Sequence, residues 1–173
     1  MEFEVNNIEE IVELIMKKMS ESSISTSSNS KNGVFENVDE AIAEAKKAQT
    51  ILFSSKLELR ERIIASIRDT LKPYITELSE LAVKETGMGR VSDKEIKNRI
   101  AIEKTPGLED LKAFAFSGDD GLTVMELSPY GVIGAITPST NPSETVICNS
   151  IGMIAAGNAV IFAPHPGAKR TSI

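Results

Sequence analysis

Two short apolar runs in the last third of the chain predict buried parallel strands. Residues 131–137 (GVIGAIT) and 158–164 (NAVIFAP) are almost wholly apolar and rich in β-branched side chains, the pattern of a strand covered on both faces. Residues 142–156 between them predict a helix, with proline in its first turn and Gly157 after its end. Strand, helix and strand at this spacing predict a βαβ unit.

The preceding residues predict helices followed by one more strand. The helical ranges, taken from the period of apolar positions, are 37–53, 55–87 and 93–114. The second is expected to bend or restart near Pro73 and to close at Gly87, and the third is interrupted at Pro106. Residues 117–121 (SGDDG) predict a turn, and residues 122–128 (LTVMELS) alternate like a half-buried strand.

The first 32 residues differ in composition from the rest. Residues 7–19 place apolar side chains on one stripe of an amphipathic helix, at Ile8, Ile11, Val12, Ile15, Met16 and Met19. Residues 20–32 are dominated by serine and predict a flexible linker. The domain, an α/β fold, is expected over residues 33–173. A tethered helix can pack on its own domain, lie on a membrane or dock in a partner's groove. Membrane binding is disfavoured because glutamates outnumber lysines on the polar face.

The composition argues against several classes of protein. The 173 residues carry a net charge of -6 with no run of Lys or Arg, which argues against nucleic-acid binding. One cysteine excludes an internal disulfide and favours a reducing compartment. No apolar segment approaches the length of a membrane span, and no metal site is expected. These features together predict a soluble cytoplasmic protein.

The polar turn after the first buried strand is the candidate site. Thr137, Pro138, Ser139, Thr140 and Asn141 occupy the carboxyl end of a strand, where α/β sheets bind ligands, and precede a helix N-terminus that favours a negatively charged oxygen. The Asn141 amide can stabilise an oxyanion during acyl transfer. Asn141 can equally be a plain helix N-cap before a proline at the first helical position. Both roles can coexist if Thr140 caps the backbone. No glycine-rich dinucleotide fingerprint or P-loop follows a strand.

Three segments resemble the N-terminal part of CoA-acylating aldehyde dehydrogenases. They are residues 83–90 (VKETGMGR), 105–124 (TPGLEDLKAFAFSGDDGLTV) and 128–169, which contain both apolar runs. The similarity covers roughly residues 33–173 and is greatest to the acetaldehyde and propionaldehyde enzymes of bacterial microcompartments. The resemblance implies a Rossmann-like parallel sheet and oxidation of a short-chain aldehyde with NAD. It also implies a cysteine thioester, coenzyme A as the acyl acceptor, and a homo-oligomer.

The resemblance assigns roles to the residues of the turn. Asn141 matches the asparagine whose amide holds the acyl oxygen. The residues that match the loop along the nicotinamide half of the cofactor are Ile136, Thr137, Pro138, Ser139 and Thr140. A lysine that contacts the adenosine ribose in many relatives is missing after the second strand. His165 stands there instead, and can contact a ribose, a phosphate or CoA, or can be an ordinary loop residue.

The lone cysteine is not expected to be the nucleophile. Cys148 lies within the predicted helix 142–156 among apolar residues, where a thiol has no activating base. The resemblance places the nucleophile downstream of these residues. Glu144 in the same helix is expected to be structural or to face solvent.

The resemblance also implies a role for the N-terminus. Residues 1–19 resemble the short N-terminal helices, called encapsulation peptides, by which such enzymes bind microcompartment shell proteins. The expected contact stripe consists of Ile8, Ile11, Val12, Ile15 and Met16. The protein is then expected inside a bacterial microcompartment. The sequence stops at GAKRTSI, where a helix should begin. It is therefore expected to be an inactive fragment of an enzyme. The alternative is a catalytically empty interaction protein that docks to shell proteins.

Overall fold

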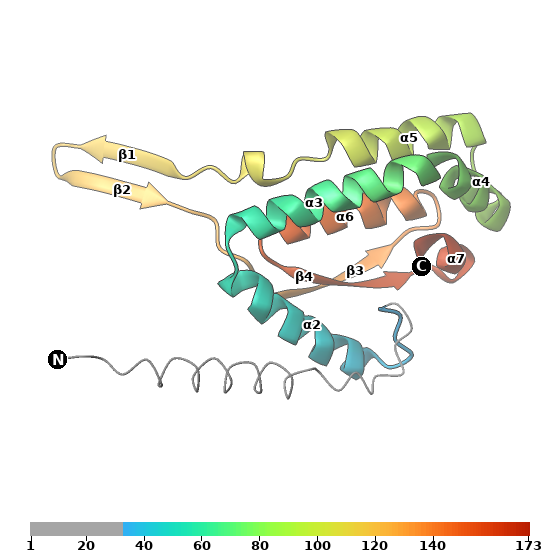
Figure 1. Cartoon of the computed structure of the whole chain (residues 1–173), viewed down its shortest axis with the longest axis horizontal. Helices are drawn as coiled ribbons and strands as arrows, with labels where there is room; N and C mark the ends of the chain where they lie inside the picture. The colour runs from blue at the N-terminus through green and yellow to red at the C-terminus, as the bar shows by residue number, and fades with distance from the viewer. Residues whose placement is uncertain (1–32) are drawn as a thin grey trace, which may run out of the picture. The chain divides into compact units, whose positions relative to one another are not determined.

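The structure, a computed structural model, describes residues 33–173. The predicted helix 7–19 and linker 20–32 lie outside the described residues. Residues 37–173 form one compact unit of helices and short strands (Figure 1). None of its helices has both the length and the apolar character needed to cross a bilayer.

The first half of this unit is helical, as predicted. The helices are α2 (Val38–Ser54), α3 (Leu57–Leu71), the 3-10 turn η1 (Lys72–Tyr74), α4 (Ile75–Thr86) and α5 (Val91–Lys104). The Asn37 side chain caps α2 by accepting the Asp39 N–H at 2.8 Å. Pro73 lies in η1, so the predicted restart is confirmed. Gly87 ends α4 at φ 67°, a left-handed conformation that glycine adopts without strain.

The predicted βαβ unit is confirmed, but the prediction that its strands are covered on both faces is wrong, because Ile136 of β3 is 86% exposed and no residue of β4 is fully buried. Strands β3 (Val132–Thr137) and β4 (Ala159–Pro164) pair in parallel, in a register that runs from Val132–Ala159 to Thr137–Pro164. Helix α6 (Pro142–Ala155) connects them, with proline in its first turn and Gly157 beyond its end. The 3-10 turn η3 (Pro166–Ala168) and α7 (Lys169–Ser172) follow β4, so a helix begins where the sequence predicts one.

The hydrophobic core lies between α6 and the helical layer of α3, α4 and α5. Its buried side chains are Ile64, Ile75, Ala101, Ile102, Ile147, Ile151 and Ala155. Each buried isoleucine contributes about 1.5–3 kcal/mol relative to exposure. Helix α6 also packs on β3 and β4, and α2 contacts the same strands. Figure 1 shows α6 above the two strands and α2 below them. The core thus fixes α6, and with it the turn that enters α6.

A β-hairpin replaces part of the predicted helical stretch. Residues 93–114 were expected to be helical, but α5 ends at Lys104. A single 3-10 turn, η2 (Leu108–Asp110), follows, and Phe114 opens strand β1 (Phe114–Gly118). Strand β1 pairs antiparallel with β2 (Gly121–Met125) around the predicted turn. The strand expected over 122–128 therefore exists, but it is shorter and is exposed along its whole length rather than half-buried.

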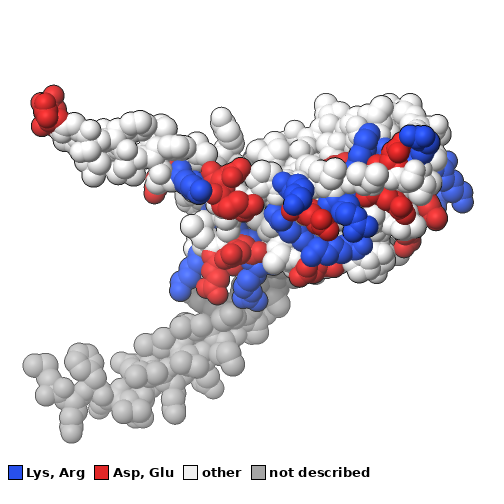
Figure 2. All heavy atoms as spheres, turned by 90° about the horizontal axis from the view of Figure 1, so that it is seen from above, with Lys and Arg blue, Asp and Glu red and all other residues white. Residues whose placement is uncertain are grey.

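The hairpin carries apolar side chains on an exposed ladder. Phe114, Phe116, Leu122 and Val124 are all exposed. Figure 2 shows the hairpin as an almost uncharged arm with acidic side chains at its tip, whereas both signs of charge are interspersed over the helices. The alternation of LTVMELS correctly indicated a strand. It did not indicate burial, because no described element covers either face.

Candidate functional site

The predicted turn joins β3 to α6 in four residues. Strand β3 ends at Thr137, and α6 begins at Pro142. Asn141 is the N-cap by backbone position, because its carbonyl oxygen accepts the Thr145 N–H at 3.1 Å and the Thr145 hydroxyl at 2.7 Å. The turn therefore stands at the carboxyl end of a parallel strand and at the start of a 14-residue helix. Both features favour binding of an oxygen-rich or anionic ligand.

The Asn141 side chain does not cap α6. It makes no hydrogen bond to the first-turn amides, so the predicted N-cap position of Asn141 is confirmed, whereas capping by its side chain is not found. Its Oδ1 instead accepts a hydrogen bond from Lys97 Nζ of α5, at 3.1 Å. Within residues 33–173, Nδ2 has no hydrogen-bond acceptor. The amide thus keeps its donor group available beside the helix N-terminus.

A buried lysine holds the backbone of the turn. Lys94 is only 3% exposed, and its ammonium donates to the carbonyl oxygen of Thr140. It also lies 3.5 Å from Glu144 Oε1 in the first turn of α6. A buried charge requires partners of this kind. Lys94 therefore ties α5 both to the turn and to the helix that the turn enters.

The ion pair belongs to a buried polar chain across three helices. The Ser143 hydroxyl donates a hydrogen bond that is shared between Asn98 Oδ1 at 2.9 Å and Glu144 Oε2 at 3.2 Å. Asn98 Nδ2 donates in turn to Ser79 of α4 at 3.0 Å. Glu144 is 7% exposed. Its structural role is thereby confirmed, and the alternative that it faces solvent is wrong.

The residues predicted to contact the cofactor differ in their exposure to solvent. Ile136 is 86% exposed, and Pro138 and Thr140 are also exposed. Ser139 is half-buried, with its hydroxyl 4.0 Å from Met88 Sδ. Thr137 is 1% exposed, and within the described residues its Oγ1 has no hydrogen-bond partner. The Thr137 side chain therefore cannot reach a ligand at the surface.

His165 lies at the same edge of the sheet as the turn. Its backbone N–H donates to the Thr137 carbonyl oxygen at 3.1 Å. Its Nδ1 accepts the Gly167 N–H at 3.0 Å, so in the neutral ring the proton is on Nε2. The side chain is exposed. The structure thus brings His165 and residues 137–141 together at the carboxyl ends of β3 and β4.

Cys148 lies away from the turn and within the helical layers. It is half-buried against the core, and its Sγ is 3.1 Å from Thr105 Oγ1. The Thr105 hydroxyl also lies 2.6 Å from the Ala101 carbonyl oxygen, to which it donates. The Cys148 thiol is therefore the donor to Thr105. In this part of the chain, no three acidic, histidine or cysteine side chains come together as a metal site.

Sequence reasoning missed the lysines of α5. Lys94 and Asn98 are buried, whereas Ile96 and Ile100 of the same helix are 59% and 54% exposed. The buried face of α5 is thus polar in its first half, at Lys94 and Asn98, and apolar in its second half, at Ala101 and Ile102. The one available signal was that Lys94, Lys97 and Asn98 share a helix face by their spacing of three and four residues.

Comparison with known proteins identifies the family. The sequence pattern of the aldehyde dehydrogenase family matches residues 10–173. The chain belongs to this family. Among aldehyde dehydrogenases, it is 48% identical to the acetaldehyde dehydrogenase (acetylating) EutE of Salmonella typhimurium, over 96% of this chain and 35% of the relative.

Solved aldehyde dehydrogenase structures share the fold. A propionaldehyde dehydrogenase from the Clostridium phytofermentans fucose utilisation bacterial microcompartment has 52% identity and a TM-score of 0.78, over 81% of this chain and 32% of its own. The Rhodopseudomonas palustris propionaldehyde dehydrogenase, with bound CoA and an acylated cysteine, has 53% identity and a TM-score of 0.79, over 83% and 33% of the two chains. An engineered glycolyl-CoA reductase of the same fold holds NADP+. The chain spans about a third of the length of the curated relatives it matches.

Proposed function

We propose that this chain forms the cofactor-side, N-terminal part of a CoA-acylating aldehyde dehydrogenase. Its substrate is a short-chain aldehyde, acetaldehyde or propionaldehyde, with NAD as oxidant and coenzyme A as acyl acceptor. The relatives named above act on such aldehydes or hold CoA. The observation that carries the proposal is the Asn141 amide, whose oxygen is held by Lys97 and whose Nδ2 is left as a donor at the head of α6.

The exposed side of β3 fits a flat cofactor group. Ile136 presents an open apolar surface, and no atom lies within 4 Å of the position of a side chain at Gly134. A ring that packs along this strand would reach the turn at residues 138–140. The backbone of the turn and the exposed His165 offer polar contacts at its border. The buried Thr137 side chain contributes none.

Asn141 supplies the chemistry that this chain can perform. Attack of a cysteine thiolate on the aldehyde carbon places negative charge on the aldehyde oxygen. The Nδ2–H of Asn141 donates to that oxygen, and the dipole of α6 adds to the stabilisation. Bound NAD would supply the hydride acceptor for the oxidation that yields the thioester. Asn141 keeps its hydrogen bond to the same oxygen while the CoA thiolate displaces the enzyme sulfur. The nucleophile is a cysteine other than Cys148.

The N-terminal segment is proposed to direct the enzyme into a microcompartment. Residues 1–19 lie outside the described structure, so the support comes from their apolar stripe and from the microcompartment relative. The stripe is proposed to bind shell proteins. The whole enzyme is proposed to act as a homo-oligomer inside a bacterial microcompartment of the cytoplasm.

The test of the proposed reaction uses the complete enzyme that carries this chain. NADH formation is followed with acetaldehyde or propionaldehyde, NAD and CoA. Asn141→Ala should lower kcat by roughly 10²–10³-fold with little change in the KM for NAD, because one oxyanion donor is lost. Asn149→Ala, elsewhere in α6, is the matched control and should keep parental kcat. Parental kcat in Asn141→Ala would contradict the assignment of this residue, and no turnover in the parent would favour the catalytically empty alternative.

A further inference from the structure

Two lysines of α5 contact neighbouring residues of the turn. Lys94 donates to the Thr140 carbonyl oxygen, and Lys97, almost one helical turn later, donates to Asn141 Oδ1 at 3.1 Å. We propose that Lys94 and Lys97 are positioning residues that set the direction of the Asn141 amide. Lys97 fixes its side chain, and Lys94 fixes the backbone from which it extends. This inference rests on the proposed function, in which Nδ2 of Asn141 meets the substrate oxygen.

Lys97 determines which end of the Asn141 amide is free. An ammonium group has only donors, so it can pair with Oδ1 and not with Nδ2. With Oδ1 held toward α5, the amide plane presents Nδ2 on the opposite side. The positive charge also polarises the amide, which makes Nδ2–H a stronger donor. A carboxamide without this partner can turn about its terminal torsion, since that torsion has a broad energy profile.

Lys94 is itself held rigidly. Its ammonium lies between the Thr140 carbonyl oxygen and Glu144, and Glu144 is fixed by the Ser143 hydroxyl. All these groups except the exposed Thr140 are buried. The carbonyl of Thr140 belongs to the peptide group whose nitrogen is that of Asn141. A fixed donor on this peptide limits the motion of the residue that carries the amide.

The test of Lys97 compares three variants of the complete enzyme. Lys97→Met should lower kcat about tenfold, a smaller loss than that of the oxyanion donor itself. The KM values for NAD and aldehyde and the melting temperature should stay at parental values. Lys97→Arg keeps a charged donor and should restore most of kcat. Lys104→Met removes an exposed lysine two turns along the same helix, and should behave like the parent. Equal kcat in Lys97→Met and Lys104→Met would overturn the role of Lys97.

A crystal structure of Lys97→Met separates this inference from the proposed function. The Asn141 amide should be rotated or should occupy two orientations, and an unchanged amide would overturn the positioning role. This readout needs no turnover. A parent enzyme that is inactive, or an Asn141→Ala variant with parental kcat, would overturn the proposed function. With an active parent and an impaired Asn141→Ala variant, parental kcat in Lys97→Met would overturn the inference alone.

The role of Lys94 has to be tested with a double substitution. Lys94→Met would leave Glu144 as an unpaired buried carboxylate, which is strongly destabilising. Lys94→Met with Glu144→Gln removes both charges and retains a side chain that can accept from Ser143. The folded double variant should lose kcat several-fold, with a displaced Thr140 carbonyl in its crystal structure. A folded double variant with parental kcat and an unmoved turn would overturn the role of Lys94.

Discussion

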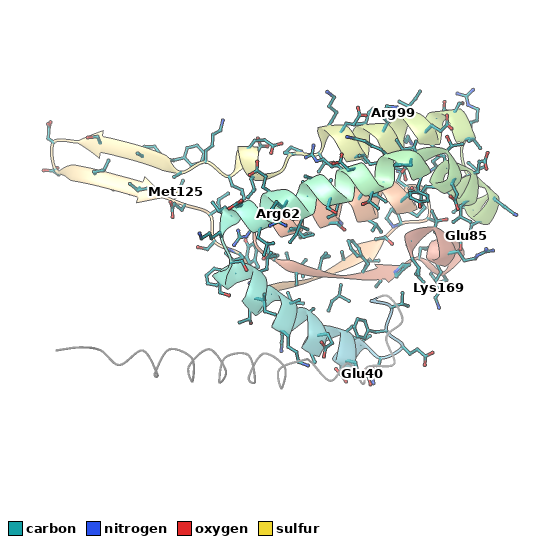
Figure 3. All side chains as sticks on the ribbon, in the orientation of Figure 1. Glu40, Arg62, Glu85, Arg99, Met125 and Lys169 are labelled. Atoms are coloured by element: carbon teal, nitrogen blue, oxygen red, sulfur yellow. The ribbon has the colours of Figure 1, made fainter. Side chains whose placement is uncertain are left out.

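The carboxylate of Glu85 in α4 accepts both the backbone N–H and the hydroxyl hydrogen of Thr171 in α7, at 2.7 and 2.6 Å. Its second oxygen accepts the N–H of Arg170 at 2.8 Å. Figure 3 shows Glu85 on the side of α4 that faces the last helix. A side chain from 85 residues earlier in the chain thus satisfies the free amides at the start of α7. Glu85 thereby fixes the segment that follows His165.

The Glu85 contact should make stability depend on pH in the acid range. Burial raises the pKa of Glu85, but hydrogen bonds from Thr171 and Arg170 and the charge of Arg170 outweigh it, and hold the pKa below the usual 4.5. A lowered pKa contributes stability that is fully present above pH 4.5 and is lost as the pH falls through the folded-state pKa. Glu85→Gln should lower the melting temperature at neutral pH, and the difference from the parent should shrink below pH 4.5. Glu80→Gln, on exposed α4 surface, is the control. A difference that grows in acid would contradict this prediction.

Gly157 should resist substitution. It has φ 81°, and a side chain there would approach the Arg60 guanidinium to 2.8 Å. Arg60 is buried and donates to the Ala155 carbonyl oxygen at the end of α6. Gly157→Ala should cost about 1–2 kcal/mol from the left-handed backbone, and more from displacement of Arg60. The melting temperature measures the loss.

The matched control for Gly157 is a glycine inside α6. Gly152 lies inside the helix with no atom near a potential side chain. Gly152→Ala should leave the melting temperature unchanged or raise it, because alanine favours the helix by about 0.5–1 kcal/mol. Equal effects of the two substitutions would show that neither the backbone nor Arg60 restricts position 157.

Cys148 should be dispensable for catalysis. Its thiol donates to Thr105 and packs against the core, so it lacks the exposed, activated environment of a nucleophile. Cys148→Ser in the complete enzyme should keep parental kcat. The 173-residue chain alone should neither reduce NAD with aldehyde and CoA nor gain an acyl group in intact-mass measurements. An acylated peptide containing Cys148 would contradict the proposal.

Residues 1–32 fused to a fluorescent protein should concentrate at microcompartment shells. Replacement of Ile11 and Ile15 by glutamate should disperse the signal, because the proposed contact stripe becomes charged. Replacement of Ser22 and Ser23 by glutamate adds the same charge outside the stripe and should leave the signal in place. A uniform signal from the unmodified fusion, in cells that make shells, would rule out this role.

The βαβ unit could be predicted because its signals are local. The apolar runs, the proline at the start of α6 and Gly157 at φ 81° each act within a few residues. Only the turn and the second strand of the hairpin were predicted. Its turn was recognised, but β1 follows a helical stretch without a break in composition, and the apolar positions of both strands are exposed rather than buried.

The partners of the candidate site could not be predicted. Lys97 lies 44 residues from Asn141, and Lys94 lies 50 from Glu144. No local pattern encodes which of the many lysines reaches a given turn. Asn141 was identified by its place after a strand, but whether its side chain also caps α6 could be decided only from the hydrogen bonds of that side chain in the structure.

The buried polar residues in the first half of α5 affect how this domain could be engineered for heat resistance. A conventional redesign would place leucine at positions 94 and 98 and charged residues in place of Ile96 and Ile100. Such a helix would bury more apolar surface and would gain stability if it packed without strain. It would also lose Lys94 and Asn98, and so the ties between the helical layer and the turn. Substitutions at positions 94 and 98 that raise the thermal stability of α5 would therefore also loosen the turn that carries Asn141.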